Sequence, residues 1–283
     1  MIRFPWGDTQ LTVLSAGTLW LDGGAMFGIV PKPLWQRLRQ PDEQNRICLA
    51  MNLLLIEDGR ERILVDTGAG TKWDAKSLEI YSMDVRTPEQ ILEPVGLQPE
   101  QIDRVVVSHL HFDHAGGNTV RDDDGRLRPS FPNARYVIQR VELETARQDN
   151  ERVRASFFPE NFEPLVSSDQ VELVQGDVRL TRQVSLRAAP GHTPGMQIVL
   201  VHAGKNTVAH MADLLPTDSH VRYPYIMAYD LEPMTTLATK KRILPEAARD
   251  DWRLILEHDA ESPIVRLVED RGRLSAQRVE LEH

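Results

Sequence analysis

The sequence predicts a single α/β domain in which two β-sheets carry helices on their outer faces. Short apolar runs bounded by turn residues alternate with helical segments, in the order strands, helix, strand, helix, strands, helix and strand. No linker-like shift in composition interrupts the 283 residues. A chain of this length is long enough for one large domain, so we expect one domain over residues 1–283.

The first half of the chain has clear strand and helix signals. Asp58-Gly59 is a strong hairpin dipeptide between two apolar runs. Thr87, Pro88 and Gln90 form the capping pattern at the start of a helix. Strands are expected at 10–16, 46–57, 61–65, 104–108 and 135–139, and helices at 87–95 and from 140 to about 148. Residues 121–128 are expected to be a charged loop, and 150–168 to be irregular.

Strands recur in the second half. They are expected at 171–174, 184–188, 196–202, 207–211 and 252–256, with a helix at about 233–243. Gly204-Lys-Asn206 is typical of a hairpin turn between two of these strands.

Composition excludes several classes of function. The net charge of −9 argues against a nucleic-acid partner, which usually needs a basic face. No apolar run approaches the roughly 20 residues of a membrane helix, and the first residues lack a signal-peptide pattern. We therefore expect a cytoplasmic protein with no membrane partner. Cys48 is the only cysteine and is expected in the core, so a metal must be held by His and carboxylate.

The strongest chemical signal is the cluster His109-Leu-His111-Phe-Asp113-His114, which follows a predicted buried strand. Imidazole and carboxylate are ligands that suit zinc, iron and manganese. On an extended segment His109 and His111 point the same way. A turn after His111 would direct Asp113 and His114 toward a second, adjacent position.

Three further pieces are weaker alone. His192 lies between the turn residues of Pro190-Gly-His192-Thr-Pro-Gly195, which would fix its imidazole, although a plain loop histidine has the same appearance. Asp213 and His258 each follow an apolar strand, where turn residues are common. The other histidines, His202, His210 and His220, are expected at the surface or the edge of the core, with His210 as a possible partner of a ligand, and His283 is expected to be disordered.

Together these pieces resemble the metallo-β-lactamase superfamily. The match is ordered and also includes Asp66-Thr-Gly68 at the end of a strand. The resemblance implies a four-layer αββα sandwich with two divalent metal ions at one edge. It implies zinc, with iron, manganese or cobalt as alternatives. His109, His111 and His192 would hold the first metal, Asp113, His114 and His258 the second, and Asp213 both. Asp66 would orient a ligand.

Several features separate branches of this superfamily. Cys48 precedes all the expected ligands, His111 stands where the diiron flavoproteins have Glu, only 25 residues follow His258, and the chain has no basic arm. The segment Asp22–Trp35, the run from His210 to Thr217, and Ala228-Tyr-Asp230 resemble the YtnP-type quorum-quenching lactonases. The resemblance implies a hydrolase that opens N-acyl-homoserine lactones with a metal-bound hydroxide.

The insert at residues 20–46 has three interpretations. Met26, Phe27 and Trp35 could wall an acyl-chain pocket, the segment could form a homodimer contact, or its aromatic residues could simply pack on the core. Phe157, Phe158 and Phe162 allow the first two interpretations as well. We also expect Tyr223 at the substrate pocket.

Asp113 and Asp213 are expected to move protons, and Tyr229 is our choice, among three tyrosines, for binding the developing oxyanion. A phosphotriesterase or arylesterase on the same site is the alternative, because both chemistries need the same two metals. A non-catalytic metal sensor is a remote alternative, since it predicts a missing ligand and all seven positions are filled. The expected partner is a small-molecule substrate, and we expect a homodimer.

Overall fold

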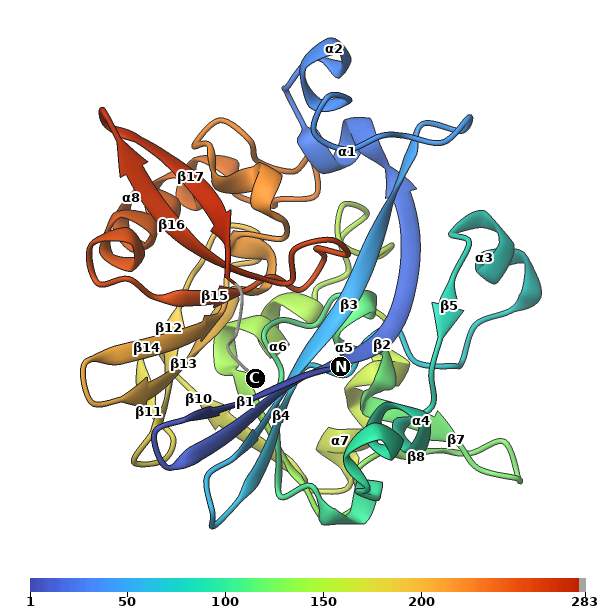
Figure 1. The fold of residues 1–283 in the computed structure, drawn as a ribbon. Helices are drawn as coiled ribbons and strands as arrows, with labels where there is room; N and C mark the ends of the chain where they lie inside the picture. Colours follow the sequence, from blue (N-terminus) through green and yellow to red (C-terminus); the bar gives the residue numbers. More distant parts are fainter. Residues whose placement is uncertain (280–283) are drawn as a thin grey trace.

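Two β-sheets packed face to face form the centre of the computed structural model, which describes residues 1–279 (Figure 1). The first sheet has eight strands in the order β1-β2-β3-β4-β6-β9-β10, with β5 paired to β2. Their bounds are β1 Ile2–Trp6, β2 Thr9–Asp22, β3 Arg46–Glu57, β4 Arg62–Val65, β5 Asp84–Val85, β6 Arg104–Val106, β9 Arg135–Gln139 and β10 Val171–Val174. Strands β4, β6, β9 and β10 are parallel to one another.

The second sheet follows chain order from β11 to β17. Its strands are β11 Val178–Arg179, β12 Val184–Ala188, β13 Gln197–Ala203, β14 Asn206–His210, β15 Arg253–Ile255, β16 Ile264–Asp270 and β17 Arg273–Arg278. Strands β14 and β15 are parallel, so their carboxyl ends lie at the same edge. A separate hairpin joins β7 (Thr119–Arg121) to β8 (Leu127–Pro129).

Helices are short except for the one that covers the second sheet. They are α1 Gly23–Phe27, α2 Lys32–Trp35, α3 Ala75–Ile80, α4 Pro88–Leu92, α5 Phe112–Ala115, α6 Arg140–Ala146, α7 Glu163–Ser167 and α8 Pro233–Arg249. Short 3-10 turns lie at η1 Glu93–Val95, η2 Pro99–Gln101, η3 Gly116–Asn118, η4 Pro159–Asn161, η5 Ala212–Leu214 and η6 Asp218–Val221.

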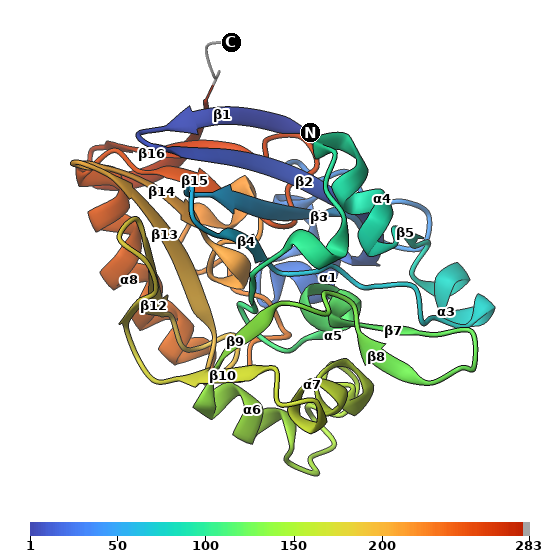
Figure 2. The same cartoon turned by 90° about the horizontal axis from the view of Figure 1, so that it is seen from below.

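Three apolar clusters separate four layers (Figure 2). The middle cluster joins the two sheets, for example through Leu54 of β3 and Val199 of β13. Their neighbours point the other way, because side chains alternate along a strand: Leu55 packs in the cluster with α4, α6 and α7, and Ile198 in the cluster with α8. The expected αββα architecture is therefore present.

Most predicted elements occur within a few residues of their expected bounds. The capping box predicted at Thr87 is present, because the Thr87 side chain accepts from Gln90 N–H and the Gln90 side chain accepts from Thr87 N–H. The helix predicted to start at Pro233 continues to Arg249, since Leu244 and Ala247 bury against the second sheet beyond Ile243.

Several segments differ from the prediction: β1, α3, β5 and β11 were not predicted, and β2 continues to Asp22, beyond the strand expected at 10–16. The charged loop at 121–128 contains parts of the β7–β8 hairpin, and the irregular stretch at 150–168 contains α7. Strands β16 and β17 were not predicted, and their hairpin extends the second sheet after the last expected strand. Cys48 is half-buried on β3 rather than fully in the core.

The insert at residues 20–46 forms α1 and α2 and projects at one end of the molecule (Figure 1). It is docked on the segment that follows η6, where Ala228 N–H donates to the Ala25 carbonyl at 2.8 Å. Gly28 has a φ of +55°, and a Cβ there would lie 2.3 Å from the Ile226 carbonyl oxygen. The close approach of these two segments therefore requires glycine at this position.

Within residues 1–279, none of the helices combines the length and apolar character needed to span a bilayer. His283, which was expected to be disordered, lies outside the described residues.

Candidate metal centre

The histidine cluster occupies the turn between β6 and α5. His109 lies in the short loop after β6, and His111 is the residue that precedes the first turn of α5. The helix then turns Asp113 and His114 away from the direction of His109 and His111. The turn predicted after His111 is thus the start of α5, and it divides the cluster into two pairs.

The other expected ligands reach the same place from the second sheet. His192 lies between β12 and β13, Asp213 lies in η5 directly after β14, and His258 follows β15. All seven side chains are buried. Strand ends at one edge of the two sheets therefore bring together residues that are far apart in the sequence.

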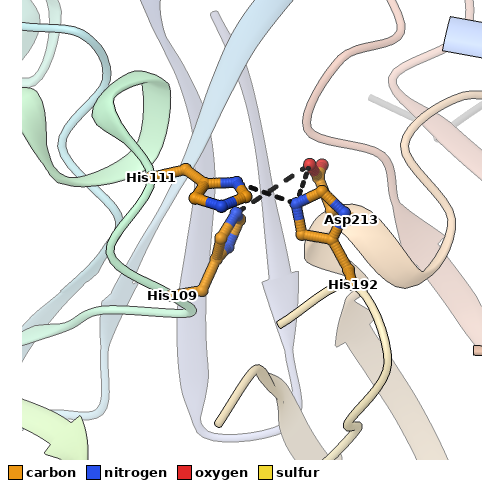
Figure 3. A group of neighbouring side chains, drawn as sticks. All are labelled: His109, His111, His192 and Asp213. Atoms are coloured by element: carbon orange, nitrogen blue, oxygen red, sulfur yellow. Dashed lines mark hydrogen bonds and ion pairs between the residues drawn. The ribbon is translucent and has the colours of Figure 1, made fainter. Parts of the chain in front are cut away.

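These seven residues form two groups of metal-binding type, His109 with His111, His192 and Asp213, and Asp113 with His114 and His258. In the first group the four side chains point toward one another (Figure 3), with His192 Nε2 2.9 Å from His111 Nδ1. In the second group His114 Nε2 lies 3.1 Å from His258 Nε2, which is 3.6 Å from Asp113 Oδ2.

Asp213 faces both groups with different oxygens. Its Oδ2 lies 3.1 Å from His192 Nε2 and 3.9 Å from His109 Nε2. Its Oδ1 lies 3.1 Å from His258 Nε2 and 3.5 Å from His114 Nε2. This is the geometry expected of a carboxylate that serves two adjacent positions.

The nitrogen and oxygen atoms of the cluster are arranged to bind divalent cations rather than to hydrogen-bond with one another. His109 Nε2 and Asp213 Oδ1 are buried without a hydrogen-bond partner among the described residues, which is costly unless a further group satisfies them. Imidazole nitrogens also face each other in both groups. Five imidazoles and two carboxylates form a ligand set that suits zinc, iron, manganese or cobalt.

The electrostatics of the cluster also favour bound positive charge. Although burial opposes ionisation, His192, His258 and His114 hold the pKa of Asp213 well below its ordinary value. Burial and the neighbouring imidazoles lower the pKa of His109 and His111. Although burial opposes it, Asp213 raises the pKa of His114, His192 and His258. The ionised Asp213 carboxylate thus attracts positive charge, and a metal ion must displace the protons of these imidazoles to bind.

The outer ring nitrogens of the histidines are held by fixed partners. His114 Nδ1 lies 3.1 Å from Asp66 Oδ2, the orienting contact expected for Asp66. His192 Nδ1 lies 3.0 Å from Asp230 Oδ1, and His258 Nδ1 donates to the Ala50 carbonyl at 2.8 Å. Such contacts set the tautomer and direction of a ligating ring. Sequence reasoning missed the roles of Asp230 and Ala50, because each lies far along the chain from its histidine.

A cavity of about 210 Å³ opens onto the cluster. Of the predicted site residues, its lining includes Met26, Asp113, Asp213 and Tyr229 together with His111, His192 and His258. Its other walls are Leu21, Leu49, Tyr81, Phe112, Arg152, Val153, Ala155, Ser156, Met227, Ala228 and Leu231, none of which was predicted. Most of these residues are apolar. The cavity therefore has a polar floor of clustered His and Asp side chains and mostly apolar walls.

Four expected pocket residues do not line this cavity. Phe27 and Trp35 are buried behind its wall, where their rings stack at 5.3 Å. Phe157 is also buried and contacts the edge of His111, with ring centroids 4.7 Å apart. Tyr223 lines a separate groove beside the β16–β17 hairpin. Phe27, Trp35 and Phe157 thus pack behind the ligands and the wall, whereas Tyr81, Phe112 and Tyr229 line the cavity.

Two histidines expected at the surface or core edge are buried. His210 lies 2.8 Å from Glu257 Oε2 and touches none of the seven clustered residues by hydrogen bond or ion pair within the described residues. His220 lies under the insert, where its Nε2–H donates to the Met26 carbonyl at 2.9 Å. Only His202 is part-exposed, as expected.

The chain is similar to proteins of known type. Residues 48–258 match the Metallo-beta-lactamase superfamily. An N-acyl homoserine lactonase from Bacillus sp is 32% identical over 164 residues, which are 54% of this chain and 58% of that protein. One from Bacillus cereus is 31% identical over 174 residues, 57% of this chain and 62% of that protein. These two alignments therefore span less than two thirds of each relative. One from Bacillus thuringiensis is 27% identical over 221 residues, 73% of this chain and 80% of its own.

Solved structures share the architecture over nearly the whole chain. A probable metal-dependent hydrolase from Staphylococcus aureus has a TM-score of 0.87 and 28% identity, covering 98% of this chain and 100% of its own. AidC, described as a dizinc quorum-quenching lactonase, has a TM-score of 0.81 and 20% identity, covering 100% of this chain and 98% of its own. The hydrolase AbOPH has a TM-score of 0.83 and 17% identity, covering 99% and 98%. The last two likenesses concern the fold alone.

Proposed function

The chain belongs to the metallo-beta-lactamase superfamily, and on this premise we propose that it is a metal-dependent hydrolase that opens the ring of N-acyl homoserine lactones. One observation carries the proposal: members of two adjoining groups of buried histidines and aspartates form the floor of a pocket whose walls are mostly apolar. Relatives described as N-acyl homoserine lactonases support the choice of substrate.

The proposed cofactor is a pair of divalent ions, with zinc as the first choice because one structural neighbour is described as a dizinc lactonase. His109, His111 and His192 would hold one ion, and Asp113, His114 and His258 the other. Asp213 would contact both. Such ions, when bound, supply a nucleophile at neutral pH and Lewis acidity for a carbonyl oxygen.

Polar groups of the pocket would bind and protonate the reacting ester. Asp113 and Asp213 line the floor and can each accept a proton from the attacking group or pass it to the ring oxygen. Tyr229 lines the same cavity, where burial and the charges of Asp22 and Asp113 raise its pKa. Its phenol therefore stays protonated and can donate a hydrogen bond to the developing oxyanion.

The apolar walls would bind the acyl chain. Met26 of the insert and Leu49 of β3 face Met227 and Leu231 of the segment after η6. Arg152 Nη2 donates to the Ala228 carbonyl at 2.5 Å, and this bond joins two segments that both line the cavity. A neutral substrate with an apolar tail suits this lining.

A phosphotriesterase or arylesterase is the second candidate. The cavity is compact, and Tyr81, Phe112 and Tyr229 give it an aromatic side. Compact aromatic subsites suit aryl esters and triesters, whereas a long acyl group needs a channel.

One assay separates the two candidates. The zinc-loaded protein is given N-acyl homoserine lactones of increasing acyl length, with ring opening followed by acid release, and in parallel a paraoxon-type triester. We expect lactone opening at a higher kcat/KM than triester cleavage. Fast triester cleavage without opening of any lactone would overturn the proposal. A His114→Ala variant, assayed in parallel, reports any contaminating hydrolase. The predicted homodimer and cytoplasmic location stay predictions.

A further inference from the structure

Glu142 on α6 is a buried carboxylate outside the seven clustered residues. It is 1% exposed, and no Lys or Arg pairs with it in the described part of the chain. Its oxygens instead accept three hydrogen bonds: Oε1 from Leu110 N–H at 2.9 Å, and Oε2 from Thr193 Oγ1 at 2.6 Å and from Gly195 N–H at 3.2 Å. The negative charge is thus satisfied by dipoles from two other segments.

Both segments carry expected ligands of the first group. Leu110 lies between His109 and His111, and Thr193 directly follows His192. One carboxylate therefore joins the two loops that supply all three imidazoles of this group. Within the described residues Glu142 makes no hydrogen bond or ion pair with the imidazoles, and it is not part of the cavity lining.

The backbone of α6 at Glu142 packs directly against Gly195 in the loop of His192. A Cβ on Gly195 would lie 2.3 Å from the backbone nitrogen of Glu142, so only glycine fits there. The oxygens of Glu142 thus reach the Gly195 and Thr193 donors over short distances. A shift of this loop would break its bonds to Glu142 and also move His192 relative to His111, which now lie 2.9 Å apart.

A second connection keeps the same segments together without Glu142. Gln197 Nε2 donates to the Val107 carbonyl, and Gln197 N–H donates to the Ser108 carbonyl, both at 2.9 Å. Gln139 Nε2 in turn donates to Gln197 Oε1 at 2.9 Å. These bonds lie at the base of the loops, so loss of the Glu142 bonds should loosen the ligands without unfolding the sheet edge.

We propose that Glu142 is a positioning residue that sets the affinity of the first metal position by fixing His109 and His111 relative to His192. The inference rests on the ligand assignment of the proposed function and is independent of the substrate. Outer contacts of this kind typically change metal affinity by about 10- to 100-fold.

The test is zinc binding by metal-free protein, measured by competition with a chromophoric chelator. Glu142→Gln keeps the shape but turns one oxygen into an NH₂ donor that must face the Leu110, Thr193 or Gly195 donors. We expect one of two zinc ions to bind about 10- to 100-fold more weakly and the other to bind as in the wild type. Glu144→Gln, the same change at an exposed position of α6, is the matched control and should bind both ions normally.

Two further variants identify the site and the cause. In a His258→Ala background, which disrupts the second group, Glu142→Gln should weaken the zinc site that remains. Thr193→Val removes one of the hydrogen bonds to Glu142 and should also weaken zinc binding at the first position, to a smaller extent. This variant tests the inference if Glu142→Gln does not fold. If Glu142→Gln bound both zinc ions with wild-type affinity, the inference would be overturned. It would also be overturned if the variant bound both ions equally more weakly and had a lower melting temperature. Two-site binding by a wild type that opens no lactone would overturn only the proposed function.

Discussion

At the scale of single residues, Asp213 differs from its neighbours because each of its oxygens faces a different group. Replacing it with Asn keeps the volume but removes the charge, and it places an NH₂ donor against imidazoles on one side. We expect Asp213→Asn to weaken both zinc sites and to lower hydrolysis by more than about 100-fold, because both positions lose a shared anionic ligand. Zinc per chain, measured by elemental analysis after gel filtration, checks this.

Asp124→Asn is the control, since Asp124 lies in the exposed β7–β8 turn. Retention of two zinc ions and near-normal activity by Asp213→Asn would refute the shared role of this carboxylate.

A second prediction at the residue scale concerns the role of the Tyr229 phenol in lactone opening. Its raised pKa keeps the phenol protonated over any practical assay range. Tyr229→Phe should therefore lower kcat for lactone opening by about 100-fold, the usual effect of losing an oxyanion donor, without changing the shape of the pH profile between pH 6 and 10. The measurement is kcat and KM across that range. Tyr223→Phe, in the separate groove, should behave as the wild type.

A different pH profile would assign Tyr229 another role. If the wild type lost activity through an alkaline limb that Tyr229→Phe lacked, the phenol would be titrating during turnover and would not act as a permanent donor.

At the scale of elements, the α1–α2 insert depends on a buried histidine. His220 donates from Nε2 to the Met26 carbonyl, accepts from Thr217 Oγ1 at Nδ1 at 2.8 Å, and stacks on Phe27 at 4.8 Å. Burial lowers the pKa of His220 to about 4. The unfolded chain, with an ordinary pKa of about 6.5, binds more protons between these values, so the contribution of His220 is complete above pH 6.5 and is lost as pH falls toward 4.

The prediction is a pH-dependent difference between the wild type and His220→Phe. Phe keeps the stack but leaves two polar groups unpaired, so at pH 7.5 it should lower the free energy of unfolding by about 1–3 kcal/mol. Between pH 7 and 5 the wild type should lose about 2 kcal/mol that the variant does not lose, so the two curves converge. Urea unfolding checks this in metal-loaded and metal-free protein, since His220 is no expected ligand. A constant difference would contradict it.

Local patterns predicted the elements best where one segment contained the whole signal. The capping box at Thr87 and the turn after His111 needed only neighbouring residues. The second strand of the β16–β17 hairpin is largely exposed and has only Leu274 and Ala276 as apolar residues, so its apolar alternation covers too few positions to identify a strand. Phe27 and Trp35 were placed in the pocket because an aromatic loop residue looks the same whether it lines a cavity or stacks behind the wall.

At the scale of the whole molecule, the seven clustered residues were predictable, but of the groups that orient them only Asp66 was predicted. The spacing of His109 to His114 predicted a metal site, and the ordered resemblance to the metallo-β-lactamase superfamily implied His192, Asp213 and His258 as further ligands. Glu142, Asp230 and the Ala50 carbonyl act on residues far away in sequence, and which segments meet at the sheet edge is decided by packing of the two sheets. No local pattern contains that information.

The clustered residues also divide between the two halves of the sandwich. His109, His111, Asp113 and His114 follow β6 of the first sheet, whereas His192, Asp213 and His258 lie on loops of the second sheet. A cation bound to both sets links the sheets at this edge, in addition to the apolar cluster between them. Binding to the folded state alone stabilises it by about 2.7 kcal/mol when the free ion is at 100 times its Kd.

We therefore expect a chelator to lower the melting temperature by about 5–10 °C, given about 2–4 °C per kcal/mol for a chain of roughly this size, and added zinc to restore it. His258→Ala, with one set of ligands incomplete, should show a smaller chelator effect. The measurement is thermal unfolding followed by circular dichroism with and without chelator. An unchanged melting temperature in protein that has lost its metal would mean that packing between the sheets holds this edge without help from the ligands.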